Sequence, residues 1–327
     1  MRILVLGGTK FLGRHTVEIA LARGHEVTLF NRGQTRPGLF PEAKHLRGDR
    51  DGDLAALRGR SFDAVVDTSG YVPRVVRETI EALGEVGHYT FVSTISVYAD
   101  LSRPPVETSP VAELAEPTEE WREAYGELKA DCEEVVRERF ADAFVPRPGL
   151  IVGPWDPTGR FTYWPARLAA GGRVLAPAPQ DADAQVIDVR DLAGWIVRAV
   201  ETGLGGTFNA VDRPVSRATV VETCRRVAGV DADVVWVDPA FLLEQGVGEW
   251  MELPLWLASD EYAGMLSVDP SPAFAAGLET RPLDETVRDT LAWVQAGDAP
   301  AETEAGLDPA KEQAVLEAWL AKSGSRV

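Results

Sequence analysis

The sequence is poor in several residue types, and each shortage excludes a class of protein. Cysteine occurs only at Cys132 and Cys224, which excludes a disulfide framework and predicts a reducing, cytoplasmic environment. The four histidines are scattered, so no His/Cys cluster has metal-ligand spacing and we expect no metal. No apolar run approaches the roughly 20 residues of a membrane helix. An apolar strand begins almost at Met1, so we expect neither a membrane partner nor a signal peptide.

Positive charge is also scarce, since 33 Lys and Arg stand against 51 Asp and Glu and give a formal net charge of -18. A nucleic-acid partner is therefore not expected, because phosphate contacts need a basic surface. The length of 327 residues allows a sizeable core with one main domain and a smaller one, and the 45% hydrophobic content is that of an ordinary globular protein. We expect a small-molecule substrate and either a monomer or a homodimer.

The opening segment carries the first motif. The apolar run Ile3–Leu6 ends at Gly7-Gly8, a helical stretch follows over 11–23, and a second β-rich run spans Glu26–Asn31. This strand–turn–helix–strand order is typical of a dinucleotide-binding corner, in which glycines admit a pyrophosphate and the helix N-terminus offers free N–H groups. A tight structural turn also needs glycine, so the motif alone leaves both interpretations open. The predicted cofactor contacts in the turn are Gly7, Thr9, Lys10, Phe11, Leu12 and Gly13.

The end of the second strand indicates which cofactor is bound. An NAD enzyme usually places an acidic residue there for the ribose 2′-hydroxyl, whereas this chain has Asn31 and Arg32. A carboxylate repels a 2′-phosphate and an arginine binds it, so Arg32 and Lys10 favour NADP over NAD. The alternative is that both are solvated surface cations.

Apolar strands alternate with amphipathic helices through the first half, which predicts an α/β fold with a doubly wound parallel Rossmann sheet. A long loop, rich in proline and acidic residues, spans 102–117 at the carboxyl end of a strand, where such folds bind ligands. Further strands are expected at 64–67 and 89–93, and helices at 73–83 and 118–139.

Composition changes after Pro146, where glycine- and proline-rich loops and most of the tryptophans occur. We predict a Rossmann domain over 1–148, to which 188–213 returns. A smaller substrate domain is expected from 149–187 and 214–297. The remainder, 298–327, is predicted to be a linker and a C-terminal helix that opens at Asp308-Pro309.

Tyr125-Gly-Glu-Leu-Lys129 is the second motif. Within a helix the two side chains lie one turn apart on one face. Tyrosine has an ordinary pKa near 10, and a neighbouring lysine cation that lowers it makes Tyr125 a usable acid/base. A plain amphipathic helix surface explains the same spacing.

Hydroxyl and aromatic side chains supply candidate substrate contacts. Thr94 and Ser96 follow the strand expected at 89–93, where they either bind a substrate oxygen or satisfy backbone groups. Trp155, Tyr163 and Trp164 either stack on a flat or cyclic substrate or pack the smaller domain.

Together these motifs resemble the extended short-chain dehydrogenases/reductases, also called the NAD-dependent epimerase/dehydratase family. The resemblance covers residues 1 to about 215 and is carried by Gly7–Gly13, Ser93–Tyr98, Tyr125-x-x-x-Lys129, Arg147–Gly149, Val152–Pro154 and Asp188–Ala193. It implies a seven-stranded Rossmann core and a Thr94, Tyr125 and Lys129 catalytic set. Lys129 is expected to hold the nicotinamide ribose and lower the tyrosine pKa, and Asp49 to contact the adenine. Arg50 and Thr68 are further predicted cofactor contacts.

The sequence departs from the family pattern at informative positions. Ile95 and Ser96 stand where sugar-nucleotide dehydratases have an Asp-Glu pair, so dehydration lacks its acid and base. Gln185 lies near the position of an arginine that binds a sugar-nucleotide diphosphate. The opening also resembles a subgroup with chloroplast RNA-binding relatives, but intact Tyr125 and Lys129 and the acidic charge disfavour that role.

The sequence therefore predicts an NADP(H)-dependent oxidoreductase that transfers hydride between carbonyl and alcohol on a small polar or cyclic metabolite. One alternative is a sugar or nucleotide-sugar epimerase that uses bound NAD(P). The other is a non-catalytic NADP-binding or regulatory protein.

Overall fold

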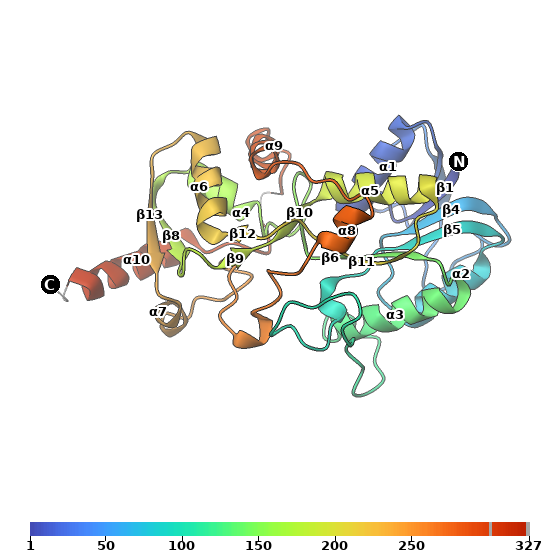
Figure 1. Ribbon diagram of the computed structural model, residues 1–327. Coiled ribbons are helices and arrows are strands. Elements are labelled where there is room, and N and C mark those ends of the chain that lie inside the picture. The colour runs from blue at the N-terminus through green and yellow to red at the C-terminus, as the bar shows by residue number, and fades with distance from the viewer. Residues whose placement is uncertain (301–302, 325–327) are drawn as a thin grey trace.

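The computed structural model describes residues 1–300 and 303–324 and is built around one seven-stranded parallel sheet (Figure 1). The predicted α/β, doubly wound fold is confirmed. The strands in spatial order are β11 (Gly206–Ala210), β6 (Phe144–Pro148), β5 (Val86–Phe91), β4 (Phe62–Asp67), β1 (Arg2–Leu6), β2 (Glu26–Asn31) and β3 (Lys44–Arg47).

Alternate residues of each central strand enter different cores, because successive side chains of a strand point to opposite faces. In β1, Ile3 and Val5 pack with one layer of helices, whereas Leu4 and Leu6 pack with the other. Figure 1 shows α1 (Phe11–Ala22) and α5 (Val189–Thr202) on one face and α2 (Pro73–Ala82) and α3 (Tyr125–Arg139) on the other. Both faces are thus covered, which explains the nearly continuous apolar strands.

The predicted start of α3 is wrong. A helix was expected from Thr118, but residues 118–124 form irregular backbone and a turn, and α3 begins at Tyr125. Ala124 has ψ 50°, outside the helical range, and caps the helix without a side-chain hydrogen bond. Tyr125 is consequently the first residue of the helix.

A second, tryptophan-containing core lies beside the main sheet. Its pairs of strands are β7 (Leu150–Val152) with β10 (Val186–Asp188), β8 (Gly172–Pro177) with β13 (Ala232–Val237), and β9 (Asp183–Ala184) with β12 (Val215–Ser216). Its longer helices are α4 (Tyr163–Ala169), α6 (Arg217–Ala228), α9 (Leu283–Gln295) and α10 (Pro309–Gly324). The shorter helical elements of the chain are η1 (Ile95–Val97), α7 (Pro239–Glu244), η2 (Asp260–Tyr262) and α8 (Ser271–Ala275).

The predicted domain boundaries stay predictions, although β11 joins the main sheet from within the segment expected to return to it. Figure 1 shows α10 at the end of the molecule opposite β1. Part of the predicted linker and C-terminal segment, residues 301–302 and 325–327, lies outside the described residues.

Candidate active site

The glycine turn between β1 and α1 forms a backbone cradle. Gly7 and Gly8 have φ of 106° and 88°, which side-chain-bearing residues rarely adopt. A Cβ on Gly13 would lie 2.8 Å from the backbone nitrogen of Gly8, so only glycine lets the helix approach the turn this closely. The Lys10 side chain does not cap α1, and the side chains of Thr9 and Leu12 are buried. The cradle fits the pyrophosphate of a dinucleotide at a helix N-terminus.

A rim of basic side chains lies beside this cradle. Asn31 is fixed, because its Nδ2 donates to the Gly7 carbonyl at 3.1 Å and its Oδ1 accepts from the Gly33 N–H at 2.9 Å. Lys10 and Arg32 are exposed. Arg47, which pairs with Asn31 in register, lies against Gly33, since a Cβ there would meet its Nη1 at 1.2 Å. The sequence reading missed Arg47 because β3 is too short to give a periodic signal.

Arg50 is held by side chains at and after the end of β4 and on α2. Its guanidinium donates to both carboxylate oxygens of Asp67 at 2.6 and 2.8 Å, and to Ser69 Oγ and Thr79 Oγ1, each at 3.2 Å. Arg50 therefore supports the end of β4, and its predicted cofactor contact stays a prediction.

Two further residues predicted to contact the cofactor, Thr68 and Asp49, lie in loops that follow strands of the main sheet. The Thr68 hydroxyl donates to the Leu6 carbonyl at 3.1 Å, which fixes it at the turn. Asp49 accepts from the Asp51 N–H at 3.2 Å in the loop after β3. Both remain predicted cofactor contacts.

Lys129 is almost fully buried, at 3% exposure. Its Nζ donates to the Gly70 carbonyl at 2.8 Å and to the Val92 carbonyl at 2.6 Å, and it lies 4.0 Å from the ring centroid of Phe91. Burial lowers the pKa of Lys129 to about 8. The lysine thus joins the ends of β4 and β5 at the edge where the cradle lies.

Tyr125 lies at the start of α3 against η1. Gly126 permits this contact, because a Cβ there would lie 2.1 Å from the Ser96 carbonyl oxygen. Burial and the neighbouring Tyr71 raise the pKa of Tyr125 to about 12, against the opposing effects of a hydrogen bond with Thr94 and the charge of Arg160. The net shift is opposite to the predicted lowering, since the desolvation of the phenol outweighs both.

Thr94 and Ser96 organise the turn beside Tyr125. The Thr94 Oγ1 accepts from the Ser96 N–H at 3.1 Å and donates to the Ser96 Oγ at 3.2 Å. The turn thus satisfies one backbone group, as the alternative interpretation expected, and still brings the Thr94 hydroxyl to the Tyr125 phenol.

An aromatic wall that sequence reasoning missed stands beside Tyr125. The Tyr71 ring centroid lies 6.3 Å from that of Tyr125 and 4.9 Å from that of Trp121. Trp121 is 39% exposed, so the wall is open to a ligand. Neither Tyr71 nor Trp121 lies in a motif, so only the folded chain brings them together.

The aromatic residues predicted from sequence lie elsewhere. Trp164 is 1% exposed and donates its Nε1–H to the Pro254 carbonyl at 2.9 Å, so its predicted substrate contact is wrong and it packs the second core. Tyr163 stacks edge-on against it, and burial raises the pKa of the Tyr163 hydroxyl. The guanidinium groups of Arg14 and Arg36 lie 3.7 and 4.1 Å from the ring centroid of Trp155.

Gln185 has no free amide to offer a ligand. Its Nε2 donates to the carbonyls of Asp212 and Val268, both at 2.7 Å, and its Oε1 accepts from the Val268 N–H at 2.9 Å. The residue is 2% exposed and serves to tie loops together.

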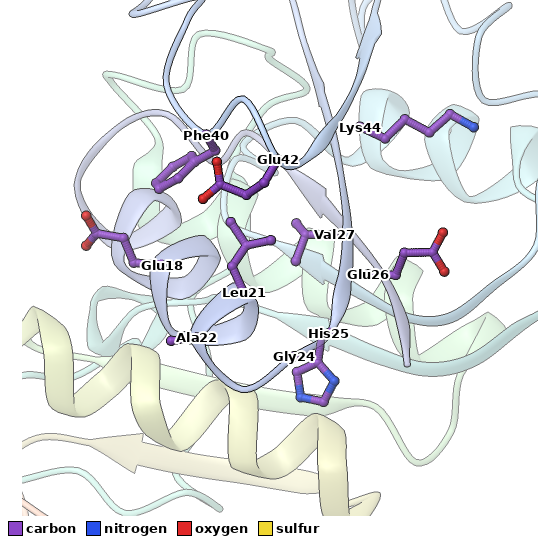
Figure 2. A pocket seen from close by; sticks show the side chains of 10 residues that line it. All are labelled: Glu18, Leu21, Ala22, Gly24, His25, Glu26, Val27, Phe40, Glu42 and Lys44. Carbon is purple, nitrogen blue, oxygen red and sulfur yellow. The ribbon is translucent and has the colours of Figure 1, made fainter.

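A hollow of about 660 Å³ lies away from these residues, between the C-terminal part of α1 and the start of β2. Figure 2 shows Leu21 and Val27 on its apolar side and Glu18, Glu26, Glu42 and Lys44 around it. Since β2 begins there, the hollow lies at the amino ends of the strands, whereas the glycine turn follows the carboxyl end of β1.

Two further searches cover the described part of the chain only. Residues 1–300 and 303–324 hold no group of three or more His, Cys, Asp or Glu side chains that could bind a metal ion. No helix among these residues has the length and apolar character needed to cross a membrane.

No family model matches the chain. It is 27% identical over 213 residues to the chloroplast stem-loop binding protein of 41 kDa b of Arabidopsis thaliana, a match that covers 59% of the chain and 53% of that protein. The chain thus spans about half the length of this relative. It is 28% identical over 295 residues to dTDP-6-deoxy-L-talose 4-dehydrogenase (NAD(P)(+)) of Kitasatospora kifunensis, with 79% of the chain and 89% of the relative covered.

Solved structures of epimerases share the fold. UDP-N-acetylglucosamine 4-epimerase from Bacillus cereus has a TM-score of 0.67 at 16% identity and covers 90% of this chain and 96% of its own. UDP-glucuronic acid 4-epimerase from the same organism, in complex with NAD, has a TM-score of 0.65 at 16% identity. The match covers 90% of this chain and 99% of the epimerase chain. At these identities the likeness shows the fold alone, and at that level the resemblance to the epimerase/dehydratase family is confirmed.

Proposed function

We propose that the protein is an NADP(H)-dependent oxidoreductase of the extended short-chain dehydrogenase/reductase family. The observation that carries the proposal is the convergence of Thr94, Tyr125 and Lys129 at the carboxyl edge of the sheet that also holds the glycine cradle. The Kitasatospora relative, which by name is a dehydrogenase that uses NAD(P)(+), supports the reaction class.

The cradle at Gly7, Gly8 and Gly13 would hold the pyrophosphate, and a bound NADPH would supply the hydride. Asn31 presents no carboxylate to a 2′-phosphate, while Arg32, Lys10 and Arg47 supply positive charge. This rim supports NADP, although the Bacillus epimerase of the same fold binds NAD.

Tyr125 is the proton donor in this proposal. With a pKa raised to about 12 it is protonated at neutral pH, which is the form that can donate to a carbonyl oxygen during reduction. Thr94 would orient that oxygen through its hydroxyl. Lys129, still largely protonated at pH 7 with a pKa of about 8, would hold the ribose of the cofactor beside it.

The test is NADPH oxidation over a panel of polar and cyclic carbonyl compounds, with Tyr125→Phe as the decisive variant. The variant removes one hydroxyl, so folding and NADPH binding should persist while kcat falls by about a hundredfold or more. Tyr262→Phe, at an exposed tyrosine of η2, is the matched control. Undiminished turnover in Tyr125→Phe would rule out this mechanism.

The second candidate is an epimerase that oxidises and re-reduces a sugar without net redox change, which the fold of the Bacillus enzymes supports. Retention of cofactor through purification, without NADPH consumption, would favour it. Binding of NADP without turnover of any carbonyl compound or sugar would instead favour a non-catalytic protein. The charge of -18 disfavours a stem-loop-binding role like that in the name of the chloroplast relative.

A further inference from the structure

We propose that Arg160 binds an anionic group of the substrate, so that the protein acts on carbonyl compounds that carry a carboxylate or a phosphate. The inference rests on the proposed oxidoreductase function, because it assigns a substrate class to the site around Tyr125. It is argued from the loop that presents Arg160, from the partners of its guanidinium and from its nearness to Tyr125.

The loop after β7 holds Arg160 through a chain of side-chain hydrogen bonds. Asp156, 1% exposed, accepts from the Thr158 N–H at 2.8 Å and the Thr158 hydroxyl at 2.7 Å. The Thr158 Oγ1 in turn accepts from the Arg160 N–H at 3.3 Å and from Nε at 3.2 Å. The guanidinium is thus fixed by one edge, which reduces the entropy lost when it binds a ligand.

The terminal amino groups of Arg160 have no partner of opposite charge at contact distance. No carboxylate within residues 1–300 and 303–324 lies within 4.0 Å of the guanidinium, and Asp156 and Glu304 act on it only from farther away. The Trp250 ring centroid lies 5.6 Å from the guanidinium carbon. Burial lowers the pKa of Arg160, so the charge bears a desolvation cost that an anionic ligand would offset.

Arg160 lies close enough to Tyr125 for its charge to affect the ionisation of the phenol. The Arg160 charge opposes the rise in the Tyr125 pKa, and Tyr125 in turn favours the charged form of Arg160. A substrate whose carbonyl oxygen meets Tyr125 would therefore place a nearby carboxylate or phosphate at Arg160. Bidentate binding of such a group is the geometry for which a guanidinium is suited.

The experiment uses matched pairs of carbonyl compounds that differ in charge: acetoacetate with its methyl ester, and dihydroxyacetone phosphate with dihydroxyacetone. Binding to the NADP-loaded full-length protein is measured by calorimetry, and NADPH oxidation is followed in parallel. The variants are Arg160→Gln and Arg160→Lys. Arg173→Gln, at a half-exposed arginine on β8, is the control.

We expect at least one anionic compound to bind tenfold to a hundredfold more tightly than its neutral partner. Arg160→Gln should abolish that preference, Arg160→Lys should weaken it less, and Arg173→Gln should preserve it. The pair that shows the preference identifies carboxylate or phosphate as the group. Equal binding within both pairs, no binding of either anion, or a preference that survives in both Arg160 variants would overturn the proposal.

Turnover separates this inference from the function on which it rests. Arg160-dependent binding of an anion without NADPH oxidation would support the Arg160 site and contradict the reductase. Turnover of neutral and anionic partners with equal kcat/KM in the parent and in Arg160→Gln would support the reductase and overturn the Arg160 site.

Discussion

Three largely buried arginines, two beside the main sheet and one in the second core, have different hydrogen-bond partners. Beside the main sheet, Arg50 donates to both carboxylate oxygens of Asp67, and Arg147 donates to both carboxylate oxygens of Glu133. In the second core, the 4%-exposed Arg217 reaches only backbone carbonyls at 3.0 to 3.4 Å, and burial lowers its pKa to about 10.

Whether a cation is paired with a carboxylate decides whether its charge is neutralised or still acts on neighbouring groups. A bidentate pair is close to neutral and fixes the elements that it joins. Lys129, in contrast, contacts two carbonyls, and Arg160 one hydroxyl, so neither charge is cancelled by a carboxylate within 4.0 Å in the described part of the chain. Of these two cations, Arg160 acts on the proposed proton donor Tyr125 through its charge, and Lys129 lies on the same helix as Tyr125.

Replacement of Glu133 should give the largest effect among the tests of this contrast between paired and unpaired cations. Glu133 is 0% exposed, and although burial alone would raise its pKa, hydrogen bonds and the charge of Arg147 lower it below the ordinary value. Glu133→Gln leaves Arg147, 3% exposed, without its counter-ion. The expected loss is about 3–5 kcal/mol in the free energy of unfolding, measured by urea denaturation.

An exposed pair provides the control for that measurement. Glu222→Gln removes the partner of Arg225 on the surface of α6, where the effect should stay below about 1 kcal/mol. The double variant Glu133→Leu with Arg147→Met removes both buried charges and should recover most of the stability. Similar losses in Glu133→Gln and Glu222→Gln would contradict the structural role of the buried pair.

Lys129→Met tests the uncancelled cation. The folded pKa of about 8 is lower than the ordinary 10.5, so between these values the unfolded chain binds more protons and a rise in pH stabilises the fold. Below about pH 8 both states are charged and the fold bears the full cost of burial. The stability of the parent relative to Lys129→Met should therefore increase by roughly 2–3 kcal/mol from about pH 7 to about pH 10.

Urea denaturation of both proteins across this range gives the difference directly, because the titrations of the tyrosines and cysteines are common to both. A difference that stays constant with pH would mean that Lys129 is not desolvated as the structure indicates. A decrease with pH would mean that a negative partner raises its pKa.

The parts of the site that sequence predicted are those with local signals. Gly7, Gly8 and Gly13 stand in one turn after an apolar strand, and Tyr125 and Lys129 share one helix, so spacing alone brings each group together. The predicted start of α3 at Thr118 was wrong, because the loop before the helix also contains helix-forming residues. Only the non-helical backbone of Ala124 marks where the loop ends and the helix begins.

The missed parts depend on contacts between distant segments. Arg47 reaches Gly33 through strand register, Tyr71 meets Trp121 across a separation of fifty residues, and the partners of Arg160 include Trp250. Trp164 was assigned wrongly for the same reason. An aromatic residue near a binding loop can contact a substrate or pack a core, and only the burial of Trp164 in the folded chain shows that it packs the core.

The exposed basic rim should give the smallest effect, because solvent already screens its charges. Arg32→Ala removes hydrogen bonds to a charged group, worth roughly 1.5–3 kcal/mol, so Kd for NADPH should rise about ten- to a hundredfold while Kd for NADH stays the same. Arg47→Ala should shift NADPH binding in the same direction, because Arg47 lies beside Asn31 at the same edge. Arg58→Ala, at an exposed arginine near the end of α2, is the control. Calorimetric titration of both cofactors against the parent and the three variants measures these affinities. Equal affinity of the parent for NADPH and NADH would show that the basic rim does not bind the 2′-phosphate. An equal loss of affinity for both cofactors in Arg32→Ala would show the same.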